Sequence, residues 1–379
     1  MDAIVTDTHT RTSVAGLRGL GRTGLDVLAI GPDRTAAGLW SRYAAGRAEA
    51  PLPSAGRTDF TELIARLAVR HGPLVVYPGR ETSIDAVLDA RPQLPPAAVL
   101  PYPGREPLAL LRDKGALATL SADAGMTAPR ILFDGAAGEL PAGSLPARCV
   151  VKPARPGGAA GSARIVGSRT ALAELASSLP ARERIIVQEH LGGPLAAIAV
   201  VVARDGRLAA RFQQRALRIW PAAAGISAAA VSVAPDERLV ASVTRMLRAA
   251  GYWGLAQVQF LESPRGPAVI DVNPRFYGSL PLALAAGVNL PAEWHNVTLG
   301  KRQAEPRPYR QGVRYRWLEA DIVAAVRGRP RALLERTPGP TAGAMWAADD
   351  PLPAAVLAVK AVTLRARRRI RASRGTDSA

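Results

Sequence analysis

The sequence predicts an α/β domain at the N-terminus followed by an α+β domain, and three observations predict this fold class. Strand-like and helix-like segments alternate over the first hundred residues, a pattern typical of a parallel sheet with helices on both faces. A proline-rich stretch at residues 92–107 then indicates a linker. Beyond it, β-like runs joined by short turns are mixed with helices.

In the first domain, we expect residues 3–6 to form a strand and the amphipathic segment 12–24 to form a helix. Further strands are expected at residues 27–30 and 74–77, each followed by a Gly/Pro pair. The closely spaced glycines that bind a dinucleotide after a first strand are missing, because Asp7-Thr8-His9-Thr10 stands there. The sequence therefore disfavours a nicotinamide site.

The second domain begins with a predicted helix over residues 106–125, which ends at a glycine. A second helix is expected over residues 236–250. Strands are expected over residues 149–152, 164–166, 185–188, 197–203, 256–261 and 268–272. We place the domain boundaries at residues 105 and 300. They divide the chain into 1–105, 106–300 and a C-terminal extension with a basic tail, 301–379.

The composition excludes several classes of protein. With 379 residues and 48% hydrophobic residues the chain has enough apolar material for two or three cores. No apolar stretch is long enough to span a membrane, and the single Cys149 cannot form an internal disulfide, so we expect a reducing cytoplasm. The formal net charge of +18 favours nonspecific attraction to polyanions without defining a function. Only four of the 49 Lys and Arg residues are lysines, so each lysine is a candidate functional residue.

The most informative stretch is the hairpin-like segment 259–278. In a hairpin of this length Gln259 faces Asp271, and residues two apart on a strand share a face, so that Asp271, Asn273 and Arg275 point the same way. Oxygen ligands of this kind suit Mg²⁺, and an arginine nearby can bind phosphoryl oxygens. The alternative is a polar strand face that ends in an Asn-Pro turn.

These residues resemble the metal and phosphate motif of the ATP-grasp superfamily, especially of enzymes similar to the large chain of carbamoyl phosphate synthetase. Three more segments follow the order of that family. Arg112-Asp113-Lys114 resembles the start of the helix with the first nucleotide-binding lysine. Residues 150–153 with the small-residue loop 157–162 resemble the second lysine and its phosphate-covering loop, and residues 186–193 resemble the adenine hinge.

The resemblance implies an N-terminal Rossmann-like pre-ATP-grasp domain followed by an ATP-grasp fold, and it implies a set of site residues. Nucleotide binding falls to Lys114, Lys152, Gly157, Gly158, Gly161, Ser162, Gln188, Glu189 and Leu191. Metal binding falls to Gln259, Asp271 and Asn273. Arg275 would act on the transferred phosphoryl group. We add Arg218 as a second catalytic candidate, because it follows a predicted strand and its planar guanidinium suits carboxylate or phosphoryl oxygens.

By the same resemblance the protein would be a carboxylate-amine ligase that uses ATP with magnesium, or manganese, and forms ADP and phosphate through an acyl phosphate. Its substrates would be a small-molecule carboxylate and an amine, on an amino acid, a peptide or a natural-product precursor. A homodimer is a family-level expectation. One departure is Leu195, which stands where the family generally has an acidic ribose ligand.

A second hypothesis belongs to another class. The scaffold could be catalytically degenerate and act as a basic protein that binds nucleic acid or an anionic membrane surface. The C-terminal tail, with six arginines between residues 365 and 374, is the candidate contact, as a basic amphipathic helix. A solvated terminal helix is the alternative for that tail.

Overall fold

The computed structural model describes residues 1–154, 163–221, 224–301, 305–328 and 339–363. It forms two compact units: unit 1 is Met1–Pro101 together with the chain from Gly343 onward, and unit 2 is Tyr102–Ala342. The domain boundaries expected at residues 105 and 300 remain predictions.

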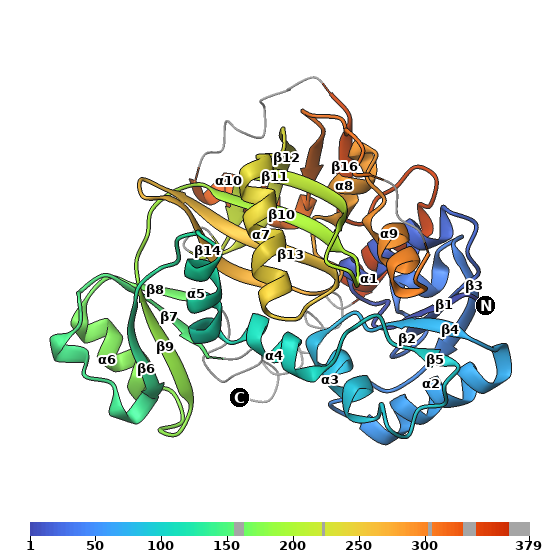
Figure 1. Cartoon of the computed structure of the whole chain (residues 1–379), viewed down its shortest axis with the longest axis horizontal. Coiled ribbons are helices and arrows are strands. Elements are labelled where there is room, and N and C mark those ends of the chain that lie inside the picture. The colour runs from blue at the N-terminus through green and yellow to red at the C-terminus, as the bar shows by residue number, and fades with distance from the viewer. Residues whose placement is uncertain (155–162, 222–223, 302–304, 329–338, 364–379) are drawn as a thin grey trace, which may run out of the picture. The chain divides into compact units, whose positions relative to one another are not determined.

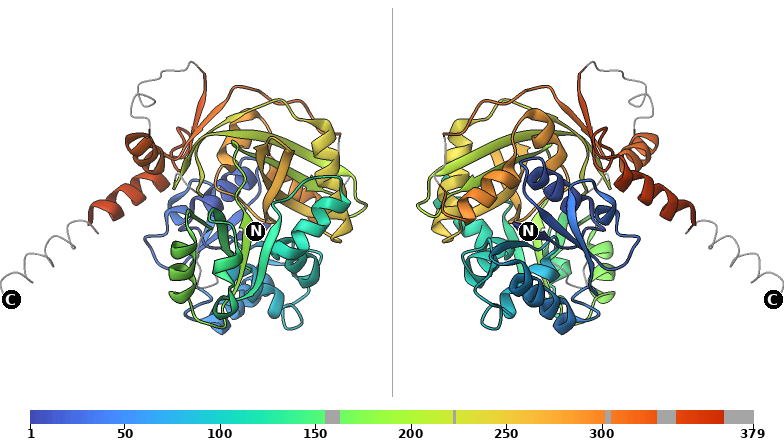
Figure 2. Two further views of the ribbon diagram at one scale, coloured as in Figure 1. Left: turned by 90° about the vertical axis from the view of Figure 1, so that its left-hand side faces the viewer. Right: turned by 90° about the vertical axis from the view of Figure 1, so that its right-hand side faces the viewer.

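Unit 1 contains a five-stranded sheet of order β3-β2-β1-β4-β5, in which every pairing is parallel. Its elements are β1 (Ala3–Val5), α1 (Arg11–Gly21), β2 (Val27–Gly31), the 3₁₀ turn η1 (Ala37–Trp40), β3 (Ala44–Glu49), α2 (Arg57–His71), β4 (Leu74–Tyr77), α3 (Glu81–Asp89) and β5 (Ala98–Val99). Helix α1 lies on one face of the sheet and α2 and α3 lie on the other (Figures 1 and 2). The predicted α/β class is confirmed.

The continuous apolar runs of the central strands explain why they are covered on both faces. All residues of β1, β2 and β4 are buried, as expected for parallel strands between two helical layers. Helix α1 begins at a cap, where the Thr10 side chain accepts a hydrogen bond from the Ser13 backbone N–H. The strand and helix positions read from the sequence agree with these elements to within a few residues.

The C-terminal part of unit 1 is attached through a buried ion pair. Arg18 of α1 donates from Nε to Asp350 Oδ2 at 2.8 Å, and the two side chains are 3% and 1% exposed. The same carboxylate accepts from Ser41 Oγ at 2.7 Å and from the Arg42 N–H at 2.9 Å. Asp350 therefore bonds to the first helix and to the segment between η1 and β3.

Unit 2 contains a four-stranded sheet of order β6-β9-β7-β8 and a seven-stranded sheet of order β14-β13-β10-β11-β12-β15-β16. Its elements are α4 (Arg105–Arg112), α5 (Lys114–Asp123), β6 (Ile131–Ala136), η2 (Ala137–Glu139), η3 (Ala142–Ser144), β7 (Cys149–Pro153), β8 (Arg164–Val166), α6 (Arg169–Ser177), β9 (Arg184–Glu189), β10 (Leu195–Val202), β11 (Leu208–Trp220), β12 (Ile226–Ser232), α7 (Glu237–Ala249), β13 (Gly254–Ser263), β14 (Gly266–Asn273), α8 (Leu280–Ala286), α9 (Leu290–Thr298), β15 (Arg314–Arg316), α10 (Leu318–Gly328) and β16 (Thr341–Gly343). Helix α7 lies across the larger sheet, and α6 covers the smaller one (Figure 1).

One expected element differs from the structure. The single helix predicted over residues 106–125 is two helices, α4 and α5, with Asp113 between them in an extended conformation. The Asp113 side chain accepts hydrogen bonds from the N–H groups of Gly115 and Ala116. Because aspartate satisfies the free N–H groups at a helix start, the chain ends one helix and begins the next at Lys114.

Within the part of the chain that the structure describes, no helix has the length and apolar character needed to cross a membrane.

Candidate active site

The hairpin of β13 and β14 forms the base of the candidate site. Its register pairs Gln259 with Asp271 and Gln257 with Asn273, so the predicted facing of Gln259 and Asp271 is confirmed. Asn273 Nδ2 donates to Asp271 Oδ2 at 3.1 Å, which places these two side chains on one face. The hairpin thus brings together one carboxylate and two amide side chains.

Two lysines from other elements reach the same strand. Lys114, the first residue of α5, forms an ion pair with Asp271 Oδ1. Lys152, on β7, donates from Nζ to the Ile270 carbonyl oxygen at 3.2 Å. The capped break at Asp113 puts Lys114 at the helix start, and the strand carries Lys152 to its end, so both ammonium groups lie beside β14.

The charges at this site influence one another. Burial works against ionisation of Asp271, but Lys114, Lys152 and Arg275 outweigh it and lower the pKa of Asp271 below its usual value. Burial lowers the pKa of Lys152 to about 8, and repulsion from Lys114 adds to this while Asp271 opposes it. These four groups carry three positive charges and one negative charge, an arrangement that favours an anion with several charges.

The predicted metal ligands fit a divalent cation of the magnesium type. Gln259, Asp271 and Asn273 offer carboxylate and amide oxygens on adjacent paired strands, and Mg²⁺ takes oxygen ligands and commonly uses one or two carboxylates together with substrate phosphates. Arg275 lies two residues after the end of β14 and donates from Nη1 to the Phe276 carbonyl oxygen at 3.0 Å. Its charge acts on Asp271, so Arg275 belongs to the same cluster.

The hinge residues lie at the end of β9. Gln188 is only 4% exposed, and its Oε1 is buried without a hydrogen-bond partner among the described residues. The Glu189 carboxylate accepts from the Arg130 N–H at 2.8 Å and forms an ion pair with Arg265. These interactions lower the pKa of Glu189 although burial opposes them. Leu191 is half-buried in the loop that follows.

Arg218 has a partner that the sequence did not indicate. Its guanidinium bonds to both oxygens of Asp321 on α10, at 2.5 and 3.0 Å, and Asp321 is fully buried. Arg316 binds the same carboxylate at 2.7 Å. The structure therefore places Arg218 in an ion-pair cluster between β11 and α10, and its catalytic role remains a prediction.

Other predicted residues fall outside this cluster of contacts. Gly157, Gly158, Gly161 and Ser162 lie outside the described residues. Leu195 is 7% exposed, begins β10 and pairs with Leu261. Two residues that sequence reasoning missed are Arg130 and Arg265, the partners of Glu189. The available signal was the position of Arg265 in the turn of the hairpin that carries the predicted metal ligands.

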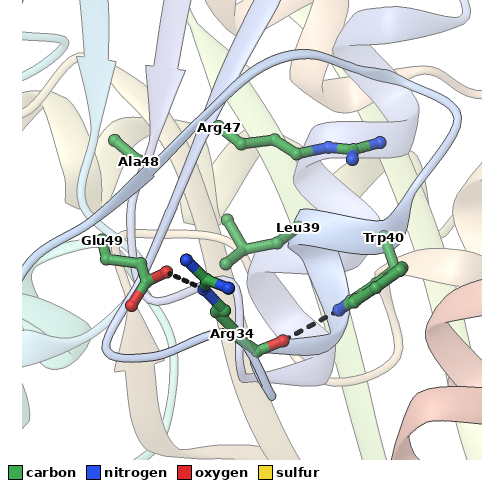
Figure 3. Close-up of a pocket in the computed structure, with 6 residues that line it drawn as sticks. All are labelled: Arg34, Leu39, Trp40, Arg47, Ala48 and Glu49. Carbon is green, nitrogen blue, oxygen red and sulfur yellow. Dashed lines mark hydrogen bonds and ion pairs between the residues drawn. The ribbon is translucent and has the colours of Figure 1, made fainter.

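Unit 1 has a separate pocket of about 360 Å³. It is lined by Arg34, Leu39, Trp40, Arg47, Ala48 and Glu49. Figure 3 shows Arg34 bonded to Glu49 Oε1 at 3.3 Å, and the Trp40 indole N–H donating to the Arg34 carbonyl oxygen at 2.8 Å. None of the residues predicted from the sequence lines this pocket.

Comparison with known proteins agrees with this fold and these motifs. A family model described as "ATP-grasp in the biosynthetic pathway with Ter operon" matches residues 181–321. This region contains the hinge strand, the hairpin and Asp321. A search of curated proteins found no match. This match confirms the resemblance to the ATP-grasp superfamily.

Solved structures share the fold over most of the chain. Biotin carboxylase from Campylobacter jejuni, in complex with a β,γ-ATP compound, is 15% identical with a TM-score of 0.66, over 83% of this chain and 74% of that one. The biotin carboxylase domain of Hydrogenobacter thermophilus 2-oxoglutarate carboxylase, a dimer with MgADP and bicarbonate, is 16% identical with a TM-score of 0.62, over 81% and 71%. L-amino acid ligase from Bacillus licheniformis is 18% identical with a TM-score of 0.59, over 81% and 78%. The predicted N-terminal Rossmann-like domain followed by an ATP-grasp fold is confirmed.

Proposed function

We propose that this protein is an ATP-dependent ligase that activates a carboxylate as an acyl phosphate for attack by an amine. The observation that carries the proposal is the cluster of Lys114, Lys152, Asp271, Asn273 and Arg275, in which three cations surround one carboxylate. A triphosphate chain with its metal ion has the complementary charge. The fold shared with ligases and carboxylases supports the same conclusion.

Each charged side chain has a role that its position supports. Lys114 and Lys152 would bind nucleotide phosphates as compact cations, and Arg275 would hold the transferred phosphoryl group through its planar guanidinium. Gln259, Asp271 and Asn273 would hold magnesium or manganese. When bound with the nucleotide, the metal neutralises phosphate charge and polarises the phosphoryl oxygens. Catalysis of phosphoryl transfer is mainly positioning and charge neutralisation.

The proposed reaction has two balanced steps. A carboxylate oxygen of the substrate attacks the γ-phosphorus of ATP, and the bond from that phosphorus to the β,γ-bridging oxygen breaks, which gives an acyl phosphate and ADP. An amine nitrogen then attacks the acyl carbon, phosphate leaves, and the nitrogen loses a proton to give an amide. The pKa of Lys152 is lowered to about 8. Its protonation near physiological pH is therefore sensitive to nearby charge, and added phosphate charge favours the protonated form.

For the substrates we propose a small carboxylate and an amine, of the amino acid, peptide or natural-product precursor class. The L-amino acid ligase with the same fold supports an amino acid as one of them. For Arg218 we retain a proposed role near the substrates. To bind a substrate carboxylate, its guanidinium would have to leave its present partner, Asp321.

The test is magnesium-dependent ADP release by the purified protein in the presence of pooled amino acids and other carboxylates. We expect release that depends on both a carboxylate and an amine, with the amide detected by mass spectrometry. Absence of stimulation by any pool, together with tight and salt-sensitive binding to RNA or anionic vesicles, would instead support the degenerate binding protein.

A further inference from the structure

The ion pair between Glu189 and Arg265 joins the two sheets of unit 2. Glu189 is the last residue of β9 in the four-stranded sheet, and Arg265 lies in the turn between β13 and β14 of the seven-stranded sheet. The Glu189 carboxylate is 19% exposed and also accepts from the Arg130 N–H at 2.8 Å. Glu189 Oε1 therefore already accepts from two groups of the protein, the Arg130 N–H and the Arg265 guanidinium.

The chain after Glu189 is fitted closely against the same hairpin. A side chain at Gly193 would bring a Cβ to 2.3 Å from the Glu262 carbonyl oxygen, and this glycine has a φ of +134°. The Glu262 N–H donates to the Pro194 carbonyl oxygen at 2.9 Å. Only a residue without a side chain permits this close approach. The hinge therefore meets the hairpin through backbone at residues 193–194 and through side chains at Glu189 and Arg265.

We propose that Arg265 is a positioning residue that sets the distance between the hinge and the metal-bearing hairpin through Glu189. The inference rests on the proposed function, in which the hinge binds the base and the hairpin binds the phosphates of one nucleotide. In this arrangement the Glu189 carboxylate does not contact the nucleotide. It is the anchor for Arg265, and recognition of the base is left to the other groups of the hinge, among them the buried Gln188 side chain.

A double-mutant cycle tests this role. Nucleotide affinity is measured by calorimetry, with magnesium and a non-hydrolysable ATP analogue, for wild type, Arg265→Gln, Glu189→Gln and the double variant. Because a partly exposed ion pair contributes modestly, each single variant should bind about two- to fivefold more weakly. The double variant should bind no more weakly than either single variant, since both remove the same interaction. Arg265→Lys should recover part of the loss.

Arg207→Gln is the matched control. Arg207 pairs with Asp205 in the turn between β10 and β11 of the same sheet, and both side chains are exposed, so this variant should bind as wild type does. Wild-type affinity in Arg265→Gln would overturn the inference, and so would losses that multiply in the double variant, because Glu189 would then contact the nucleotide independently. A wild-type protein that binds no nucleotide would instead overturn the proposed function, and the inference with it.

Discussion

Lys114 and Asp271 form an ion pair across 157 residues of sequence, between the first residue of α5 and strand β14. Asn273 occupies the other oxygen of the same carboxylate. A metal ion at Asp271 therefore has to compete with Lys114, and a nucleotide that draws Lys114 toward its phosphates would release the oxygen. In the proposed site, nucleotide and metal binding would therefore be coupled through this one carboxylate.

Asp271→Asn should lower magnesium-dependent ADP formation by about a hundredfold or more, because it removes the only carboxylate of the proposed metal ligands and the partner of Lys114. The measurement is a coupled ADP assay at saturating magnesium. Asp205→Asn, which alters an exposed ion pair in a turn, is the control and should remain active. Full activity in Asp271→Asn would refute the assignment of the metal site.

Lys152→Met should stabilise the protein while weakening nucleotide binding. The pKa of Lys152 is lowered to about 8, from an ordinary value of 10.5. Below about pH 8 the native state holds a charge that its surroundings disfavour, so its replacement should raise the Tm at pH 7. Between about pH 8 and 10.5 the native wild type loses this proton while the unfolded chain keeps it, so wild-type stability rises and the advantage of the variant shrinks.

Scanning calorimetry from pH 6.5 to 10 measures this effect, and calorimetric titration with the ATP analogue gives the affinity. A Tm difference that stays constant across the whole range would contradict the lowered pKa. A variant with unchanged nucleotide affinity would exclude Lys152 from phosphate binding.

Gln188→Leu should reduce the preference for adenine over guanine. The buried Gln188 Oε1 lacks a partner among the described residues, and an unsatisfied acceptor favours a ligand with a donor, which adenine offers in its exocyclic amino group. We expect ATP affinity to fall by roughly tenfold, about 1.4 kcal/mol, with little change for GTP. Gln214 lies on β11, and its buried Oε1 likewise has no partner in the part of the chain that the structure describes. It gives the control Gln214→Leu, in which the ATP-to-GTP ratio should not change. Equal loss of both nucleotides in Gln188→Leu would disprove base recognition.

Asp350→Ala should destabilise unit 1 by about 3 kcal/mol, because it leaves the buried Arg18 guanidinium unpaired. The neighbouring Asp349 provides the matched comparison. Asp349 is 41% exposed and pairs with the partly exposed Arg22, so Asp349→Ala should cost less than about 1 kcal/mol. Urea unfolding of the full chain measures both. Similar losses of unfolding free energy in the two variants would show that the buried Arg18–Asp350 pair stabilises the protein no more than the exposed Arg22–Asp349 pair.

Much of this structure could be predicted because the signals are local. Apolar runs marked the most buried strands of both units, such as β1, β4 and β10, whereas β3 and β11, in which polar residues interrupt the apolar ones, were not predicted. The length of the segment between Gln259 and Asp271 fixed a hairpin whose register pairs them. The order of short motifs then indicated the family. Where a local signal competed with the apolar pattern, prediction failed: Asp113 is a strong helix cap, and it divides a segment that the pattern alone had presented as one helix.

Contacts between distant polar residues could not be predicted. Arg218 meets Asp321 across 103 residues, and Glu189 meets Arg265 across 76. In a chain with so many arginines, neither charge nor spacing distinguishes such a partner from a solvated side chain. These pairs depend on which strands become neighbours, and this information appears only in the assembled sheet.

The buried Arg18 has a consequence for the order in which the chain folds. Its acceptor, Asp350, is synthesised after the whole of unit 2, so a ribosome exposes the complete sequence of residues 102–342 while unit 1 still lacks the group that compensates a buried charge. The five strands of the N-terminal sheet are therefore complete long before Arg18 gains its partner, and the last contact of unit 1 forms only when the end of the chain is made.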